Sequence, residues 1–264
     1  MSACRLLYDD KLVDLSATAT ASSEASEYPV ENVFTNNYSE VWRSDAADSS
    51  GETIVFDFGS SVDVNDIAIG NTNIRETATV KIQGNNADSW GAPIIDETID
   101  VTSMDGTRRC IYHHFDGSGL RYWRLVVIDD GNPDGFIEIG KVMLGDAVTL
   151  ADNYDATFTR RRLRNNVIHR TEYNQAFVYN RDYGAAFGLS WTNCQEETRD
   201  QIRALELALN GNGRPFFFVL DPTDPAEAFW VRMEGDIEVG RVSFDVFVIR
   251  MNLIEEMPGQ IVPR

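Results

Sequence analysis

The sequence has little of what catalytic and metal sites are usually built from. Its 264 residues include only three histidines and three cysteines, and the histidines do not follow the His-Glu-x-x-His spacing of a zinc site. The Gly-x-Ser-x-Gly turn of serine hydrolases and the Gly-x-x-x-x-Gly-Lys-Ser/Thr phosphate loop are also missing. The sequence therefore predicts a protein that is not an enzyme and that has no cofactor and no metal site.

Long apolar runs are absent as well. No stretch of about 18 apolar residues occurs, so no membrane-spanning helix is expected. Residues 1–11 lack the charged segment and apolar run of a secretory signal. The odd set of Cys4, Cys110 and Cys194 fits no redox or zinc spacing and is typical of a chain made in a reducing cytosol.

Basic residues are scarce, with 23 Lys and Arg against 42 Asp and Glu, a formal net charge of −19. So acidic a surface repels phosphate backbones, which disfavours nucleic-acid binding. Residues 1–150 hold 25 acidic and 10 basic residues, whereas residues 151–264 hold 17 and 13. This asymmetry and a plausible linker at 145–157 predict two domains, residues 1–148 and residues 149–264.

The pattern of the chain is β-rich. Short segments of β-branched and aromatic residues recur between Gly, Asn, Asp and Pro, and they predict strands. In the first half these are residues 53–58, 64–69, 77–83, 109–115, 122–128 and 137–144. In the second half they are 167–173, 176–179, 185–191, 215–220, 229–233 and 241–253. Residues 53–58 alternate in polarity, whereas the denser apolar pattern of 122–128 predicts a strand buried on both faces.

One helix is expected, over residues 195–209. Asn193 or Thr192 would cap it, and Glu196 would complete a capping box. An apolar stripe formed by Ile202, Leu205 and Leu209 predicts packing across a sheet. The fold class is therefore mainly β: a jelly-roll β-sandwich followed by an α+β sandwich with one flanking helix.

Loops between the predicted strands offer a few candidate sites. The oxygen-rich run Asp129–Gly135 suits calcium, but the same residue types build ordinary tight turns, and the turn is favoured. Trp90, in a polar loop, would either stack on a sugar or a partner, or fold back over the sandwich. His113, near a strand end, would be either a ligand contact or a solvated loop residue.

A basic run lies at Arg160, Arg161, Arg162 and Arg164. Without interleaved aromatic residues it does not fit a nucleic-acid patch. Arginine is favoured in protein interfaces and pairs with carboxylates, so a subunit contact is expected, with an exposed linker face as the alternative.

Five motifs in the first half occur in an order that resembles a discoidin domain, the coagulation-factor type C (F5/8 type C) module. They are Ala19-Thr20-Ala21-Ser22-Ser23, Asn32-Val33-Phe34 with Trp42-Arg43-Ser44, Thr53 to Gly59, Arg121 to Leu125, and Ile137 to Val142. The resemblance implies a jelly-roll β-sandwich that binds sugar or lipid through loops at one end.

The resemblance also suggests roles for single residues. Tyr38, Trp90 and His113 are the nearest candidates for ligand contacts, whereas Trp42 and Trp123 are expected in the core. Where the family usually has Asp-Gly, at a position that often helps to hold a structural calcium, this chain has Thr35-Asn36. That departure speaks against calcium here.

The second half resembles phage tail proteins of the distal-tail or minor-tail kind. The resemblance lies in the strand–helix–strand order, in Phe229 to Met233, and in a long final strand that leads to Asn252-Leu253-Ile254-Glu255-Glu256-Met257-Pro258-Gly259. It implies a domain that assembles into rings.

Together the two resemblances predict a structural component of a phage tail tip or baseplate. Its second domain would form a homo-oligomeric ring and would also contact other tail proteins. Its first domain would contact proteins or host-surface glycans. The chain would be made in the host cytoplasm and reside in the virion tail, without membrane insertion. The alternatives are a stand-alone carbohydrate-binding protein with a dimerisation domain, and an enzyme carrying a binding module.

Overall fold

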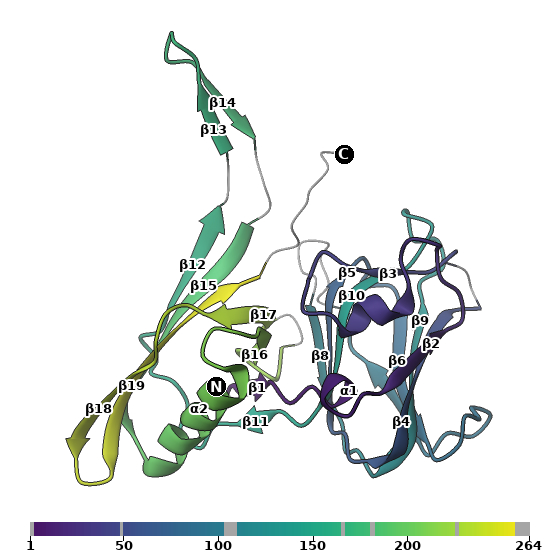
Figure 1. Ribbon diagram of the computed structural model, residues 1–264, viewed down its shortest axis with the longest axis horizontal. Helices are drawn as coiled ribbons and strands as arrows, with labels where there is room; N and C mark the ends of the chain where they lie inside the picture. Colours follow the sequence, from purple (N-terminus) through teal and green to yellow (C-terminus); the bar gives the residue numbers. More distant parts are fainter. Residues whose placement is uncertain are drawn as a thin grey trace. The chain divides into compact units, whose positions relative to one another are not determined.

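A computed structural model describes most of the chain (Figure 1), namely residues 3–47, 50–102, 110–164, 167–179, 183–224 and 227–256. The chain divides into two compact units. The first comprises Met1–Leu150 and Phe216–Trp230, and the second comprises Ala151–Pro215 and Val231–Arg264. The structure thus groups Phe216–Trp230 with the first unit. The domain boundary between residues 148 and 149 stays a prediction.

Two antiparallel sheets form the sandwich of the first unit. The five-stranded sheet has the order β2 (Thr18–Ala21), β4 (Glu52–Val62), β9 (Leu120–Ile128), β6 (Thr79–Asn85), β7 (Ile95–Ile99). The four-stranded sheet has the order β3 (Trp42–Arg43), β10 (Glu138–Gly145), β5 (Asp66–Thr72), β8 (Cys110–His114). The predicted fold class, mainly β with a jelly-roll-like sandwich, is confirmed.

The core of the sandwich lies between the two sheets. In β4, Ile54 and Phe56 are buried while the residues between them are half-exposed, as the alternating pattern predicts. Trp42 and Trp123 are both buried, as expected. The prediction that residues 122–128 are buried on both faces is wrong. Every second residue from Tyr122 to Ile128 is half-exposed, because this sheet turns one face to the core and the other to solvent.

A buried ion pair ties two segments outside the sheets to β10. The Nζ atom of Lys141 lies 2.7 Å from Asp10 Oδ2, directly before α1 (Lys11–Asp14). It also donates to the carbonyl of Phe34, 3.0 Å away, at the end of the 3-10 helix η1 (Val30–Phe34). Lys141 is fully buried, so a single ammonium group holds two chain segments in place from inside the protein.

A second apolar cluster in the first unit joins distant parts of the chain. β1 (Arg5–Leu7) pairs antiparallel with β11 (Val148–Thr149) and with β16 (Phe216–Val219). Leu7 and Phe217, from β1 and β16, pack there with other buried side chains that include Tyr38, Met143 and Trp230. Residues 216–230 therefore complete a core begun by the first 150 residues.

The second unit is built around β15 (Tyr183–Cys194). On one side β15 pairs with β12 (Thr159–Arg164), and on the other with β19 (Val246–Glu255). β19 also pairs with β18 (Glu238–Ser243) and with the last residues of β17 (Ala228–Met233). Between β12 and β15, the strands β13 (Val167–Arg170) and β14 (Ala176–Tyr179) form a two-stranded ribbon.

Two details of the second unit differ from the prediction. The strand expected over 241–253 is instead the hairpin β18–β19, because Asp245 takes a left-handed conformation (φ 60°) that turns the chain. The expected helix is confirmed as α2 (Glu196–Leu209), which ends at left-handed Asn210. The predicted cap is wrong: Gln195 occupies the N-cap position, and the carboxylate of Asp152 accepts its N–H at 2.8 Å.

No helix within the described ranges is long and apolar enough to cross a membrane.

Candidate functional site

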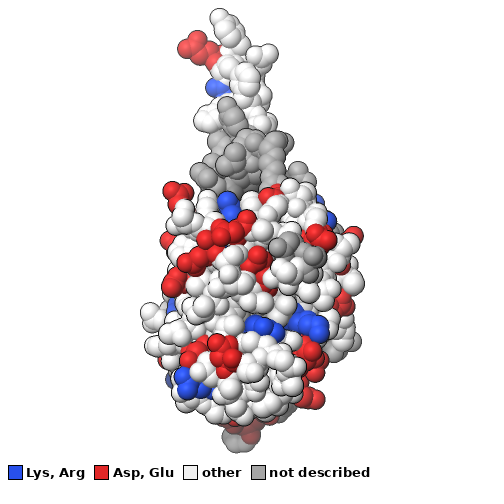
Figure 2. Space-filling view, turned by 90° about the vertical axis from the view of Figure 1, so that its right-hand side faces the viewer, with Lys and Arg blue, Asp and Glu red and all other residues white. Residues whose placement is uncertain are grey.

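The outer face of the five-stranded sheet carries a row of polar side chains. Strand register places Gln83 of β6 between Arg124 of β9 and Asp96 of β7. Lys81 and Tyr122 lie two residues along the same strands and therefore share this face. Figure 2 looks onto the side of Figure 1 where these strands lie and shows acidic and basic groups interspersed among uncharged surface. We call the set Lys81, Gln83, Asp96 and Arg124, together with Trp90, the polar row.

Hydrogen bonds fix the members of the polar row. Arg124 Nε donates to Gln83 Oε1 at 2.9 Å, and Gln83 Nε2 donates to Asp96 Oδ1 at 3.0 Å. Lys81 Nζ lies 3.2 Å from the same Asp96 oxygen. The hydrogen bond from Gln83, with a further contribution from Lys81, lowers the pKa of Asp96, which stays ionised at neutral pH. Side chains held in this way keep their geometry before a ligand arrives.

Trp90 lies at the end of this row, in the connection between β6 and β7. Its Nε1 donates to Asp88 Oδ1 at 2.7 Å, and the guanidinium carbon of Arg124 lies 4.5 Å from the ring centroid. This separation is typical of a cation–π contact. Trp90 is half-exposed. The ring thus rests on the sheet through Arg124 while part of it remains in contact with solvent.

A second aromatic ring lies on the same face. Tyr122 contacts the guanidinium group of Arg121 at 4.8 Å. Arg121 in turn forms two hydrogen bonds to Asp57, of 2.7 and 2.9 Å. These bonds lower the pKa of Asp57 to about 2. The face therefore combines two aromatic rings with charged groups whose positions are set by their neighbours.

Tyr38 lies elsewhere, in the second apolar cluster. Only 7% of the residue is exposed, its ring stacks on Trp230 with centroids 6.1 Å apart, and its hydroxyl accepts the Asn71 N–H at 2.7 Å. A ring buried to this extent cannot stack on a ligand unless the core opens. The structure thus places Tyr38 as a packing residue, and the ligand-binding role expected for it has no exposed surface to use.

His113 has a third environment. It is half-buried in β8, and its ring stacks on Phe115 with centroids 6.2 Å apart. Burial lowers the pKa of His113, which favours the neutral ring, and its Nε2 has no hydrogen-bond partner among the described residues. Tyr38 thus lies in the second apolar cluster, Trp90 between β6 and β7, and His113 on β8 of the other sheet. The ligand contacts expected for Trp90 and His113 stay predictions.

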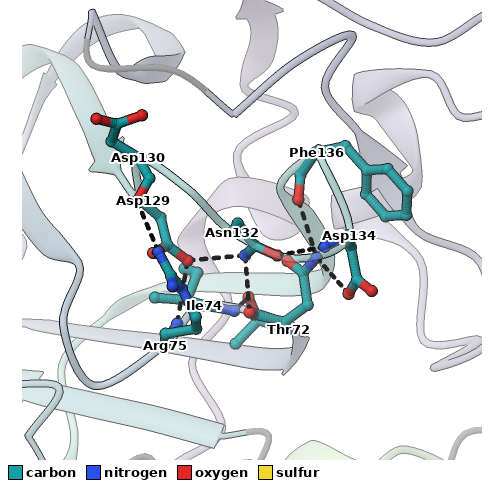
Figure 3. Close-up of polar contacts among 9 residues, drawn as sticks. Thr72, Ile74, Arg75, Asp129, Asp130, Asn132, Asp134 and Phe136 are labelled. Carbon is teal, nitrogen blue, oxygen red and sulfur yellow. Dashed lines mark hydrogen bonds and ion pairs between the residues drawn. The ribbon is translucent and has the colours of Figure 1, made fainter.

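In the oxygen-rich loop Asp129–Gly135, side-chain oxygens accept hydrogen bonds from other groups of the protein (Figure 3). Arg75 Nε donates to Asp129 Oδ1 at 2.8 Å, and Asn132 Nδ2 donates to Asp129 Oδ2 at 2.8 Å. The N–H of Asp134 donates to Asn132 Oδ1 at 3.0 Å, the local turn pattern of Asn. These contacts favour the plain turn. Among the described residues no group of three or more His, Cys, Asp or Glu side chains could hold a metal ion.

The predicted basic run lies on β12, which within the described part of the chain pairs on one side only, with β15. Arg160, Arg161 and Arg162 are exposed, and the Arg160 guanidinium lies 5.7 Å from the Phe187 ring centroid. The backbone of Arg164 pairs with Tyr183, and its side chain lies outside the described residues. The subunit contact expected for these arginines stays a prediction.

Comparison with known proteins bears on the first unit. The model of a family described as the XRCC1 N-terminal domain matches residues 11–94, which include β2 to β6 and Trp90. The motifs that resembled a discoidin domain lie on β2, β4, β9 and β10, in the two facing sheets of the sandwich. The fold of the first unit is discoidin-like.

Several solved structures are similar to this discoidin-like unit. One is chitosan-binding module 1 from a chitosanase/glucanase of Paenibacillus sp. IK-5, with 22% identity over 52% of this chain and 98% of that one, at a TM-score of 0.41. Another is the CBM32 of AlyQ in complex with 4,5-unsaturated mannuronic acid, with 20% identity over 48% and 92% and a TM-score of 0.37. The lectin domain of lectinolysin with Lewis b has 16% identity over 48% and 89% and a TM-score of 0.39. Scores and identities this low carry no inference about function.

A search of curated proteins found no match. Neither the matching family nor these three solved structures bear on the resemblance of the second half to phage tail proteins, which stays a prediction.

Polar-row residues other than Trp90 were missed by sequence reasoning. Gln83 and Arg124 are 41 positions apart and meet only through the register of β6 and β9. The available signal was the alternation of β9, where Tyr122, Arg124 and Val126 share the outer face.

Proposed function

We propose that the discoidin-like unit is a non-catalytic module that binds carbohydrate on the outer face of its five-stranded sheet, at the polar row. The observation that carries the proposal is the half-exposed Trp90 ring beside Arg124 and the exposed carboxylate of Asp96, which the buried Gln83 (7% exposed) links by hydrogen bonds. The C–H face of a sugar ring packs against an aromatic ring, a carboxylate accepts hydrogen bonds from neighbouring hydroxyls, and a guanidinium group donates to them. The polar row offers both kinds of contact within one surface.

Electrostatics narrows the class of glycan. Asp88 and Asp96 lie beside Trp90 and Gln83, and the whole chain carries a net charge of −19. Such a field opposes the approach of polyanions. The site should therefore prefer neutral or amino sugars to uronic-acid polymers.

A binding experiment with the full chain tests this proposal. Suitable probes are a chitosan oligosaccharide, the Lewis b tetrasaccharide and a mannuronic-acid oligosaccharide, measured by isothermal titration calorimetry and extended on a glycan array. Trp90→Ala should weaken binding of the preferred sugar at least tenfold, a loss of about 1.4 kcal/mol. Arg124→Lys, which keeps the charge but removes the planar group, should also weaken it.

The matched control is Tyr173→Ala. Tyr173 is 91% exposed in the second unit, so its removal deletes an exposed aromatic ring without touching the polar row. This variant should bind as the unaltered protein does. A Trp90→Ala protein that keeps full affinity and a native circular dichroism spectrum would refute the assignment of the site. Absence of binding to all sugars on the array would refute the function.

A second candidate function is a structural role in a phage tail tip or baseplate. The specific observation that favours an assembly role is the set of exposed apolar side chains on the β13–β14 ribbon and the β18–β19 hairpin of the second unit, among them Phe177 and Phe244. Under this proposal the chain is made in the host cytoplasm and resides in the virion. Mass spectrometry of purified particles from the source of the sequence tests it, since a tail component must copurify in fixed ratio to the other tail proteins.

A further inference from the structure

The β13–β14 ribbon exposes apolar side chains on both of its faces. Ile168 pairs with Val178 and His169 pairs with Phe177, so the two pairs point to opposite sides. The exposed fractions are 56% for Ile168, 50% for Val178 and 56% for Phe177. Figure 1 shows the ribbon beyond the ends of β12 and β15, apart from the rest of the second unit. A two-stranded ribbon by itself is at best marginally stable in water, so packing against a partner surface would stabilise this one.

The same unit carries a second exposed apolar surface, at the β18–β19 hairpin. Every residue of β18 is exposed, and among the described strands β18 pairs on one side only, with β19. The exposed fractions are 54% for Val239, 58% for Val242 and 81% for Phe244 at the turn. An edge strand with apolar side chains is a template for association with another chain.

These two surfaces lie at different ends of β15. The ribbon precedes Tyr183, at the start of β15, whereas β18 lies beside the part of β19 that pairs with the other end of β15, near Cys194. Val239 stands level with Trp191, eight residues from Tyr183, which is about 26 Å at about 3.3 Å per residue, and Phe244 lies further along. A second copy of the chain can bring the two surfaces together.

The charges around the two surfaces are complementary. Residues 159–179, from β12 through the ribbon, contain five arginines and one acidic residue, Glu172. Residues 234–245, around β18, contain four acidic residues and one arginine, Arg241, and one of the four, Glu238, pairs with Arg250 of β19 at 3.4 Å. In a chain with net charge −19 the basic segment stands out, and the acidic segment of a neighbouring copy would offset it.

We propose that copies of this chain associate head to tail, with the β13–β14 ribbon of one copy lying on the β18–β19 hairpin of the next. Apolar side chains would form the centre of this contact, and the flanking arginines and carboxylates would set its direction. Because each copy offers both surfaces, the contact repeats and gives a closed ring or an open chain. The proposal does not depend on sugar binding, and either can fail without the other.

Sedimentation velocity of the full chain, from about 1 to about 100 µM, measures this association. The unaltered protein should form species larger than a dimer, and raising the salt from about 50 to about 500 mM should weaken them. Phe177→Glu alters only the ribbon and Phe244→Glu alters only the hairpin. Both positions are exposed, so each variant should fold, as circular dichroism will verify, and each should associate at least tenfold more weakly.

Mixing the two variants gives the sharpest test. Each retains the surface that the other has lost, so an equimolar mixture has one intact contact and should stop at a dimer of two 29.6 kDa chains. The matched control is Leu207→Glu, an exposed position on α2 (72%), which should associate as the unaltered protein does. Any one of three results overturns the proposal: no species beyond a dimer in the unaltered protein at about 100 µM, unchanged association of either variant, or a mixture that does not form the dimer.

Discussion

Replacing Lys141 by methionine tests how the first unit holds its N-terminal segments. Methionine has a similar length and no charge, so the change removes the ammonium group and little else. Asp10 is buried (6% exposed), and the change leaves its carboxylate without the Lys141 Nζ atom that lies 2.7 Å away. It also leaves the Phe34 carbonyl without its donor.

The expected cost follows from the charge that remains. Removing one partner of a buried ion pair typically costs about 3 to 5 kcal/mol. The variant can escape part of this cost by protonating Asp10. For a carboxyl group with the ordinary pKa of 3.8, protonation at pH 7 costs about 4 kcal/mol. Burial already raises the pKa of Asp10 in the unaltered protein, so protonating Asp10 costs less free energy than protonating an ordinary carboxyl group. We expect a loss of about 3 kcal/mol at pH 7.

The loss should depend on pH. A carboxyl group whose pKa is raised in the folded state stabilises that state when protonated, at low pH, and this contribution is lost as pH rises through the folded pKa. The gap between Lys141→Met and the unaltered protein should therefore narrow as the pH falls from 7 to 5. Adding Asp10→Asn to Lys141→Met removes the unpaired charge and should recover at least half of the loss at pH 7.

Urea unfolding, with hydrogen exchange of peptides from β4 and β9, reports the free energy of unfolding of the first unit. Exchange is needed because the chain has two units and need not unfold in one step. Two outcomes would refute the reasoning. One is a variant within about 1 kcal/mol of the unaltered protein at pH 7. The other is a double variant no more stable than Lys141→Met.

Three further predictions concern the first unit and the thiols. A Cβ at Gly117 would lie 1.6 Å from the carbonyl oxygen of Val64, so Gly117→Ala should cost about 3 kcal/mol or more in urea unfolding. Gly91→Ala, where nothing lies within 4 Å, is the control and should change stability by less than about 0.5 kcal/mol. Asp57 has a depressed pKa, about 2 against the ordinary 3.8, through its hydrogen bonds to Arg121. Its stabilisation is present above pH 3.8 and is lost as pH falls through 2, so Asp57→Asn should be less stable than the unaltered protein at pH 5 and should match it below pH 2 in acid titrations. All three cysteines are buried, so a thiol-reactive disulfide reagent should label them only after denaturation, and rapid labelling of the native protein would contradict their placement.

The sequence predicted those parts of the fold that depend on local pattern. Residues 53–58 alternate strictly, and they became the centre of β4; the apolar stripe of 195–209 became α2. Features that depend on distant residues were not predictable in this way. The N-cap of α2 is satisfied by Asp152, 43 positions before Gln195.

The candidate site was likewise predicted only where local pattern was enough. An exposed tryptophan in a polar loop drew attention to Trp90, but its setting depends on Arg124 and Gln83, which strand register brings together. Tyr38 looked like a loop residue because the residues that cover it, Phe217 and Trp230, lie 179 and 192 positions further along the chain. β12 was not predicted as a strand, since its run of arginines shows no apolar alternation.

The return of residues 216–230 to the first unit affects how this protein can change in evolution. A gene segment ending near codon 150 would encode a sandwich that lacks Phe217 and Trp230 and exposes the faces of Leu7 and Tyr38 on which they pack. Single-crossover recombination ending there would transfer the core between the two sheets intact but would leave this second apolar cluster uncovered. Inheritance of the two units together keeps the cluster covered.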